Sequence, residues 1–324
     1  MKPTKLLAPL IAGLAIFAAQ PALAQQYPAK PVQMIVPFPP GGSTDIMARV
    51  LSARLQESLG QPVVVHNRAG AGGVIGTEAA ARSAPDGYTL LLSSSAPLAV
   101  GLSLNPDIRY DVLKDLTPVS MVGDVPLVIV THPKFEARSL SELVDYAKSR
   151  PGETTFALNA LGSQSHLLTE LLQLRTKTSI NMIPYKGSGP AVIDLLGGVV
   201  SADIENMPAV LQHIRAGDLR PLAILSSERA AYLPDVPTMT ELGYPEFVAS
   251  PWFAVMAPQG TDPAIIGLLN KHINDALQSD SVMEAFSKQG AQPVVATPAE
   301  TGKFISEEIR KWADIVRETG AKLQ

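Results

Sequence analysis

Residues 32–60 read VQMIVPFPPGGSTDIMARVLSARLQESLG. The apolar run over 32–36 predicts a short β-strand that is covered on both faces. Apolar residues then recur at helical spacing from Ile46 to Leu59, and Gly60 ends the pattern, which predicts an amphipathic helix over 44–59. A glycine-rich loop therefore joins the end of a strand to the start of a helix. Repetition of this unit is typical of an α/β sheet.

The same alternation continues along the chain. Ser139 and Glu142 predict a capped helix that ends before Pro151, and Thr297 with Glu300 predicts a C-terminal helix that runs past Trp312. Further strands are predicted over 63–66, 88–93, 127–131, 155–158, 181–183, 199–204, 222–225 and 252–256. A chain of this length exceeds one ordinary hydrophobic core, so we expect two lobes.

The first residues have the pattern of a secretory signal. Lys2 and Lys5 precede an apolar stretch over 6–19, and a small-x-small site ends at Ala24. An uncleaved anchor has a similar pattern, but this apolar stretch is shorter than the ~20 residues that span a membrane. We therefore expect residues 1–24 to be removed by cleavage after Ala24.

Composition excludes some partners and compartments. Loss of the two lysines of the signal takes the formal net charge from −4 to −6, which argues against nucleic acid. The chain has no cysteine, so it contains neither a disulfide nor a lipid-attachment cysteine. Export without cysteine fits a bacterial periplasm.

Four loops rich in glycine or serine each follow a predicted strand and open a helix. They cover residues 39–45, 70–73, 159–164 and 186–190. Such loops meet at the carboxyl ends of the strands, where open α/β sheets bind ligands. Glycine lets the backbone approach a ligand, and a helix N-terminus offers unpaired N–H donors. The four loops together predict an anion-binding cleft, although each alone could be a tight turn.

Tests for enzyme motifs mostly fail. Ile75 stands where a dinucleotide fingerprint needs its third small residue, and neither a Walker-type loop nor a Gly-x-Ser-x-Gly elbow occurs. The five histidines lack metal-ligand spacing, so we expect no metal and no cofactor. Ser163 and His166 form the one candidate Ser-His pair, and the alternative role of His166 is ligand contact or packing.

Asp203 and Glu205 share one face if 199–205 is a strand, because side chains alternate along a strand. Two acids in an anion cleft would repel a carboxylate. Either they face away from the cleft, or the ligand also brings a donor such as a hydroxyl or an ammonium group.

Several segments resemble the tripartite tricarboxylate transporter receptor family, also called Bug receptors. The segments lie at 27–31, 35–42, 63–73, 85–91, 184–187 and 233–238, in the family's order, and the resemblance covers nearly all of the predicted mature chain. The resemblance implies a two-lobed α/β periplasmic binding protein of the Venus-flytrap type. Lobe 1 would comprise residues 25–125 and 250–324, and lobe 2 residues 126–249.

The resemblance also implies a function. A protein of this family captures a small organic carboxylate between its lobes and delivers it to a membrane permease of one large and one small subunit. It has no enzymatic activity and is expected to be a monomer. A periplasmic sensor that signals through a membrane partner is the alternative of a different class, and a Ser-His hydrolase is the third.

The ligand-binding residues are carried over from the family's motifs or taken from the four loops. They are Phe38, Gly42, Ser43, Thr44, Ala71 and Ser94 in the first lobe, and Asn159, Gly162, Ser163, His166, Gly187 and Asp203 in the second. One departure concerns the second-lobe loop, where Ala160 replaces the family's first glycine. If that position needs a positive φ, alanine is strained there and the loop takes another path.

Overall fold

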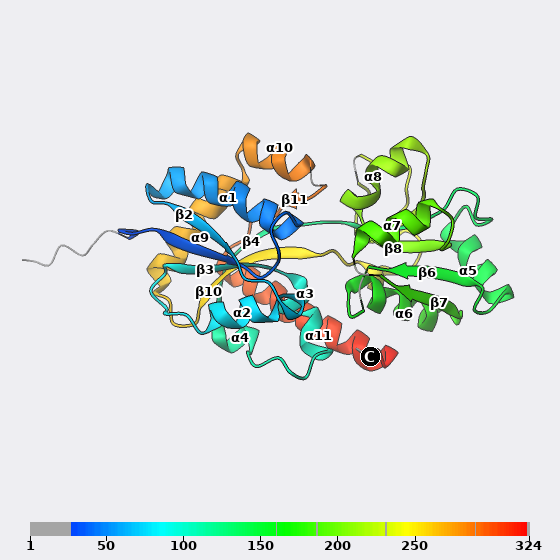
Figure 1. The fold of residues 1–324 in the computed structure, drawn as a ribbon, viewed down its shortest axis with the longest axis horizontal. Helices are drawn as coiled ribbons and strands as arrows, with labels where there is room; N and C mark the ends of the chain where they lie inside the picture. Colours follow the sequence, from blue (N-terminus) through cyan, green and yellow to red (C-terminus); the bar gives the residue numbers. More distant parts are fainter. Residues whose placement is uncertain (1–26, 160, 186, 231, 289, 323–324) are drawn as a thin grey trace, which may run out of the picture.

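The chain forms two α/β lobes that lie side by side, each built on its own sheet (Figure 1). The computed structural model describes residues 27–322 except 160, 186, 231 and 289, so the predicted signal segment lies outside the described residues. Within this part of the chain no helix is long and apolar enough to cross a membrane.

The first lobe contains a six-stranded sheet with helices on both faces. Its elements are β1 (Val32–Val36), α1 (Ser43–Leu59), β2 (Val63–Asn67), α2 (Val74–Ala81), β3 (Thr89–Ser94), α3 (Ser95–Leu98), α4 (Val112–Asp115), β4 (Leu116–Asp124), β10 (Trp252–Pro258), α9 (Pro263–Leu277), α10 (Asp280–Lys288), β11 (Gln292–Pro293) and α11 (Pro298–Thr319). The strand order is β11-β4-β10-β3-β1-β2. Strand β1 is parallel to β2 and β3, whereas β10 is antiparallel to β3 and β4.

The second lobe repeats this architecture on a five-stranded sheet. Its elements are β5 (Leu127–Thr131), α5 (Leu140–Ser149), β6 (Thr154–Leu158), α6 (Gln164–Thr176), β7 (Ile180–Pro184), α7 (Ser188–Leu196), β8 (Ala202–Asn206), α8 (Met207–Ala216) and β9 (Arg220–Ile224). The strand order is β7-β6-β8-β5-β9, with β6 parallel to both of its neighbours and β5 antiparallel to both of its own.

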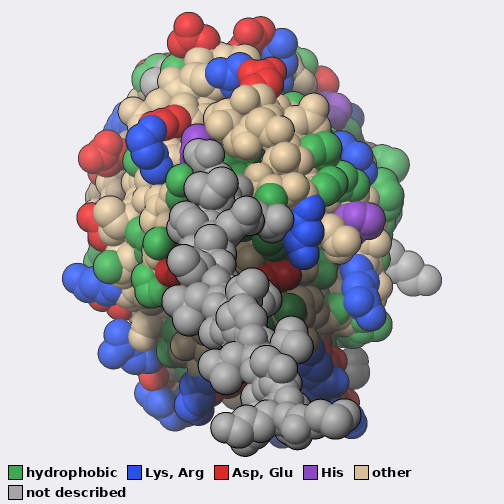
Figure 2. All heavy atoms as spheres, turned by 90° about the vertical axis from the view of Figure 1, so that its left-hand side faces the viewer, with side chains coloured by type: hydrophobic (Ala, Val, Ile, Leu, Met, Phe, Trp, Pro, Cys, Tyr) green, Lys and Arg blue, Asp and Glu red, His purple; other side chains and the backbone are tan. Residues whose placement is uncertain are grey.

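The outer end of the first lobe has a mixed surface. Figure 2 shows acidic and basic side chains interspersed on this face.

All nine predicted strands are present, and one of them is shifted along the chain. Two further strands, β4 and β11, were not predicted. The strand predicted over 199–204 begins at Ala202, because a turn with Gly198 at φ +71 precedes it and leaves Val199 67% exposed. Strand β4 was not predicted, since Pro118 and Gly123 interrupt its pattern; β10 pairs with it through two register irregularities. The two-residue strand β11 also escaped prediction.

Both predicted helix starts are confirmed. Thr297 and Glu300 form a complete capping box at the start of α11, and the Ser139 side chain accepts a hydrogen bond from the Glu142 N–H at the start of α5. Each bond satisfies a helix donor that has no partner inside its own helix.

The chain passes between the two sheets in two short segments that lie side by side. Strand β4 ends at Asp124 and β5 begins at Leu127, while the return segment runs into β10. The Val125 N–H donates to the Pro251 carbonyl oxygen at 2.9 Å, and the Ser250 hydroxyl donates to Asp124 Oδ2 at 3.0 Å. The two segments therefore form one hydrogen-bonded connection.

Helix α11 runs from the first lobe to the second and ends beside α6 (Figure 1). Near its middle, Glu308 Oε2 accepts hydrogen bonds from the indole N–H of Trp252 at 3.0 Å and of Trp312 at 2.9 Å. Both indoles are almost fully buried. At its end, Glu318 forms an ion pair with Arg175 of α6 at 2.7 Å. The helix thus links the lobes beside the two crossing segments.

Two acids lie in the core of the second lobe. Strand β8 places Asp203 and Glu205 on one face, as predicted, and both side chains are fully buried. Within the described residues neither oxygen of Asp203 has a hydrogen-bond partner. Burial raises the pKa of Asp203 well above its ordinary value, and the nearby Glu205 raises it further. Burial therefore favours the protonated form of Asp203.

Glu308→Ala should destabilise the protein strongly, because it leaves two buried indole N–H groups without an acceptor. Each unpaired buried donor costs about 1–3 kcal/mol. Urea unfolding followed by tryptophan fluorescence measures the loss directly, since Trp252 and Trp312 are the only tryptophans of the chain. Glu307→Ala, at an exposed neighbouring position, is the matched control and should leave the midpoint nearly unchanged. Equal midpoints for the two variants would contradict the assignment.

Asp203→Asn should change how stability depends on pH. Because the folded state raises the pKa of Asp203, its contribution is complete below the ordinary value of about 3.9 and is lost as pH rises toward the raised value. The variant cannot ionise and should lose less stability between about pH 4 and pH 8 than the unmodified protein. Unfolding free energies over this range test it, with Asp107→Asn in an exposed loop as the control. Parallel profiles for all three proteins would refute the buried acid's role.

Candidate functional site

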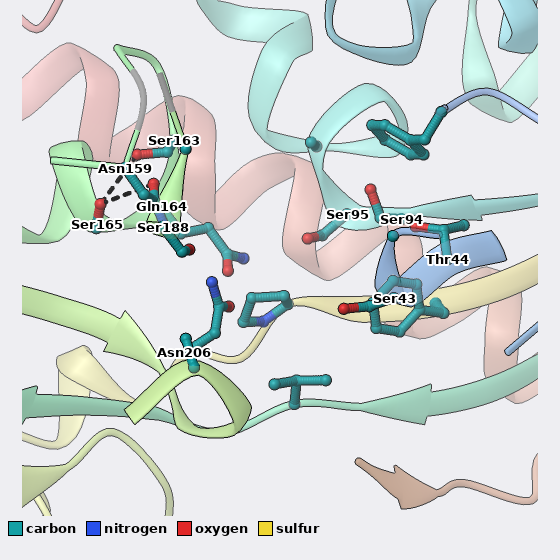
Figure 3. A pocket seen from close by; sticks show the side chains of 18 of the residues that line it. Ser43, Thr44, Ser94, Ser95, Asn159, Ser163, Gln164, Ser165, Ser188 and Asn206 are labelled. Atoms are coloured by element: carbon teal, nitrogen blue, oxygen red, sulfur yellow. Dashed lines mark hydrogen bonds between the residues drawn. The ribbon is translucent and has the colours of Figure 1, made fainter. Parts of the chain in front are cut away.

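A cavity of about 890 Å³ opens between the lobes where the two crossing segments join them. Its lining residues come from both lobes and from the crossings: Phe38, Pro39, Pro40, Gly42, Ser43, Thr44, Ser94, Ser95, Ala96, Val100, Val125, Leu127, Asn159, Gly162, Ser163, Gln164, Ser165, Gly187, Ser188, Asn206, Pro208, Ala209, Pro251 and Phe253. Figure 3 shows the hydroxyl and amide side chains of the two lobes on opposite sides of this cleft. The described lining residues are all uncharged.

The first-lobe wall is built around a buried acid, Asp45. Its carboxylate accepts hydrogen bonds from the Gly41 N–H, from Arg49 and from Asn67, each at 2.9 Å. Burial by itself raises the pKa of Asp45, but these hydrogen bonds outweigh burial and lower it to about 2. Asn67 also donates to the carbonyl oxygen of Phe38 at 3.0 Å. Asp45 and Asn67 therefore hold the glycine-rich loop in place from behind.

This loop delivers the open N-terminus of α1 into the cleft. No side chain caps the helix at Gly42, so the first N–H groups of α1 have no capping partner. Ser43 and Thr44 line the cavity here, and Ser94 and Ser95 face it from the end of β3 (Figure 3). Within the described residues no hydrogen bond engages these four hydroxyls. The first-lobe wall is thus a set of available donors at the positive end of a helix dipole.

The second-lobe wall has two helix starts of different kinds: α7 begins without a side-chain cap at Gly187, whereas α6 is capped. Ser163 caps α6 by accepting a hydrogen bond from the His166 N–H at 3.2 Å. The Gly162 N–H donates to His166 Nδ1 at 3.1 Å. The N-terminus of α6 is therefore partly satisfied by its own side chains.

His166 is turned away from the cleft. Its side chain is almost fully buried and lines a separate hollow with Leu161, Glu170 and Met182. Nε2 lies 3.8 Å from Glu170 Oε1, and Nδ1 accepts the Gly162 N–H. Burial lowers the pKa of His166, although the charge of Glu170 opposes this, so the neutral imidazole is favoured. Nδ1 is therefore occupied by the Gly162 N–H and Nε2 faces Glu170, so this arrangement leaves no ring nitrogen directed at Ser163 as a base.

The structure brings nine of the twelve predicted binding residues into the cavity wall, and it places Ala71, His166 and Asp203 elsewhere. Ala71 has φ +47, at the start of a turn that lies behind Phe38. At Gly73 of that turn, φ is +98 and an added Cβ would lie 3.1 Å from the Phe38 ring. This turn supports the cleft wall from outside. Ala160, whose replacement of a glycine was noted, lies outside the described residues.

Sequence reasoning missed several lining residues. The polar ones are Ser95, Gln164, Ser165, Ser188 and Asn206. Gln164 and Ser188 lie within loops that were identified, and Ser165 follows one of them, so their first-turn helix positions could have indicated all three. Asn206 is the last residue of β8, whose end was predicted at residue 204. The apolar lining residues belong to no local sequence motif.

The apolar part of the wall comes from segments far apart in sequence. Phe38, Val100 and Phe253 belong to the first lobe, while Val125 and Leu127 lie where the chain crosses to the second. An apolar surface of this kind suits the uncharged body of a ligand, whereas an open helix start suits a charged group. No cluster of three metal-ligating side chains occurs among the residues that the structure describes.

Comparison with known proteins agrees with this geometry. Residues 47–321 match the model of the tripartite tricarboxylate transporter family receptor. The chain is 72% identical over 321 residues to Protein BugT of Bordetella pertussis, covering 97% of this chain and 98% of that protein.

Solved structures show the same fold with ligands bound. An R. palustris protein with adipate is 36% identical, has a TM-score of 0.80 and matches 92% of this chain and 100% of its own. The protein MatC from Rhodopseudomonas palustris with bound malate is 32% identical, has a TM-score of 0.75 and matches 90% of this chain and 100% of its own. Since the family model and a near full-length relative agree, the chain belongs to the tripartite tricarboxylate transporter receptor family.

Proposed function

We propose that this protein captures a small organic carboxylate in the cleft between its lobes. The observation that carries the proposal is the uncapped N-terminus of α1, which opens into the cavity beside the unengaged hydroxyls of Ser43 and Thr44. Hydrogen bonds to a charged group contribute about 1.5–3 kcal/mol each, so a few of them offset an association cost of several kcal/mol. The adipate and malate found in two relatives support this ligand class.

Closure of the lobes on the ligand is part of the proposal. Lobe 1 comprises residues 25–125 and 250–324, and lobe 2 residues 126–249. The hydrogen-bonded pair Val125 and Pro251 forms a narrow connection about which the lobes rotate. Closure would bring Ser163, Asn159 and Gly187 toward the first-lobe donors.

Delivery completes the proposal. The protein is exported, loses residues 1–24 and acts in the periplasm as a monomer. It hands its ligand to a membrane permease of one large and one small subunit and performs no chemistry on it. The family match to a transporter receptor and the orientation of His166 support this part.

Ser43→Asp tests the carboxylate site, because it puts a fixed negative charge at the open start of α1. We expect a panel of mono-, di- and tricarboxylates to raise the melting temperature of the unmodified protein by several degrees at about 100 times the dissociation constant. The variant should lose more than tenfold in affinity while the free protein stays as stable, since an acid at a helix N-terminus is favourable.

Ala264→Asp is the matched control for Ser43→Asp. It adds the same charge to the exposed first turn of α9, away from the cleft, and should bind like the unmodified protein. Unchanged affinity in Ser43→Asp, or equal losses in both variants, would contradict carboxylate binding at α1.

Small-angle scattering tests lobe closure. A saturating carboxylate from the panel should reduce the radius of gyration of the unmodified protein, because the lobes approach each other around the ligand. Ser43→Asp under the same conditions should show no reduction. Superimposable profiles with and without ligand, in a sample whose melting temperature the ligand raises, would refute closure and leave capture intact.

A further inference from the structure

The buried acid Glu205 lies directly behind the second-lobe wall and holds three cleft residues. Its Oε1 accepts hydrogen bonds from Asn159 Nδ2 at 3.4 Å and from Ser188 Oγ at 2.8 Å. It also accepts from the backbone N–H of Asn206 at 2.6 Å and from its side-chain Nδ2 at 2.8 Å. Glu205 itself is not among the residues that line the cavity. Its influence on a ligand therefore passes through its three partners.

These contacts fix where the hydrogens of the wall point. Four donors converge on Oε1, so Oε1 stays an acceptor whether or not Glu205 carries a proton. Ser188 must donate its single hydroxyl hydrogen to this oxygen. The Asn206 amide must turn its nitrogen toward Glu205, because the opposite orientation would place two acceptors in contact.

Glu205 also orients the side chain of Asn159, which in turn orients the hydroxyl of Ser165. Asn159 directs its amide nitrogen at Glu205, and its Oδ1 accepts the hydroxyl hydrogen of Ser165 at 3.1 Å (Figure 3). The hydrogens of Ser165 and Ser188 are thus both used inside the protein. The side-chain acceptors that remain for the cleft are the oxygen lone pairs of Ser188 Oγ and Asn206 Oδ1.

The side chains of the first-lobe wall have the opposite polarity. The hydroxyls of Ser43, Thr44, Ser94 and Ser95 have no hydrogen-bond partner within the described residues, so each can rotate to donate. They stand beside the uncapped N–H groups of α1. The second-lobe wall also offers the open N–H groups at the start of α7, but its Ser188 and Asn206 side chains present oxygens that are fixed as acceptors. Figure 3 shows the two sets facing each other across the cavity.

We propose that the ligand carries a hydrogen-bond donor, a hydroxyl or an ammonium group, which meets the acceptors of the second lobe while its carboxylate meets α1. Glu205 is the positioning residue that creates this preference. The inference rests on the proposed carboxylate binding and narrows it. A ligand without the donor would leave Ser188 and Asn206 with unpaired acceptors on closure, which binding sites reject.

Pairs of carboxylates that differ only by a hydroxyl test the inference. The probes are succinate with malate, propionate with lactate, and benzoate with 3-hydroxybenzoate. Calorimetric dissociation constants for the mature protein should favour the hydroxylated member by about tenfold in each pair that fits the cleft. The ratio within a pair is the readout, because a loss of stability does not change it.

Two variants at one position isolate the acceptor role of Glu205. Glu205→Gln keeps an oxygen that can accept from the same partners and should retain the preference. Glu205→Met has a similar size and no such oxygen, so Ser188 and Asn206 become free to donate and the preference should fall to within about twofold. Val128→Ala is the control for destabilisation, since buried Val128 pairs with Glu205 across the sheet and does not line the cavity. It should keep the preference.

The possible outcomes separate the inference from the proposed function. Equal or weaker binding of the hydroxylated members to the unmodified protein would overturn the inference and leave carboxylate capture standing. A preference that survives in Glu205→Met would overturn the role of Glu205. Failure of all six probes and of the wider carboxylate panel to bind would overturn the proposed function and the inference together.

Discussion

The structure depends on one constraint: the first N–H groups of an α-helix have no partner within the helix. In each lobe the strand-to-helix loops lie at the carboxyl ends of the strands, so several helix starts point toward the space between the lobes. The start of α1 has no side-chain cap and opens into the cavity. A cleft bordered by such donors is suited to an anion.

The lobes meet this constraint in different ways. In the first, Asp45 ties back the loop before α1, and the helix start itself stays open. In the second, Ser163 and His166 satisfy part of the start of α6. Glu205 accepts hydrogen bonds from residues of the cleft wall, Ser188 among them. Each lobe therefore keeps an acid behind its wall, where the acid sets the hydrogen-bonding character of the cleft without facing the ligand.

The connection between the lobes is also held by hydrogen bonds and ion pairs between a few residues. Two crossing segments share the bond between Val125 and Pro251, and α11 passes beside them with Glu308 holding two indoles. The ion pair between Arg175 and Glu318 lies at the far end of this helix. Rotation of the lobes would change the geometry around these contacts more than the geometry inside either sheet.

The sequence by itself determined the α/β class, the nine predicted strands, the helix caps and the loops that border the cleft, because each depends on residues close together in the chain. Strand β4 escaped prediction, since its proline and glycine are tolerated only through the irregular pairing with β10. Only the tertiary structure decided that His166 turns away, that Glu205 holds Asn159, Ser188 and Asn206, and that Phe253 joins the apolar wall. These arrangements join segments far apart in sequence, and the direction in which a side chain points depends on neighbours that no local pattern specifies.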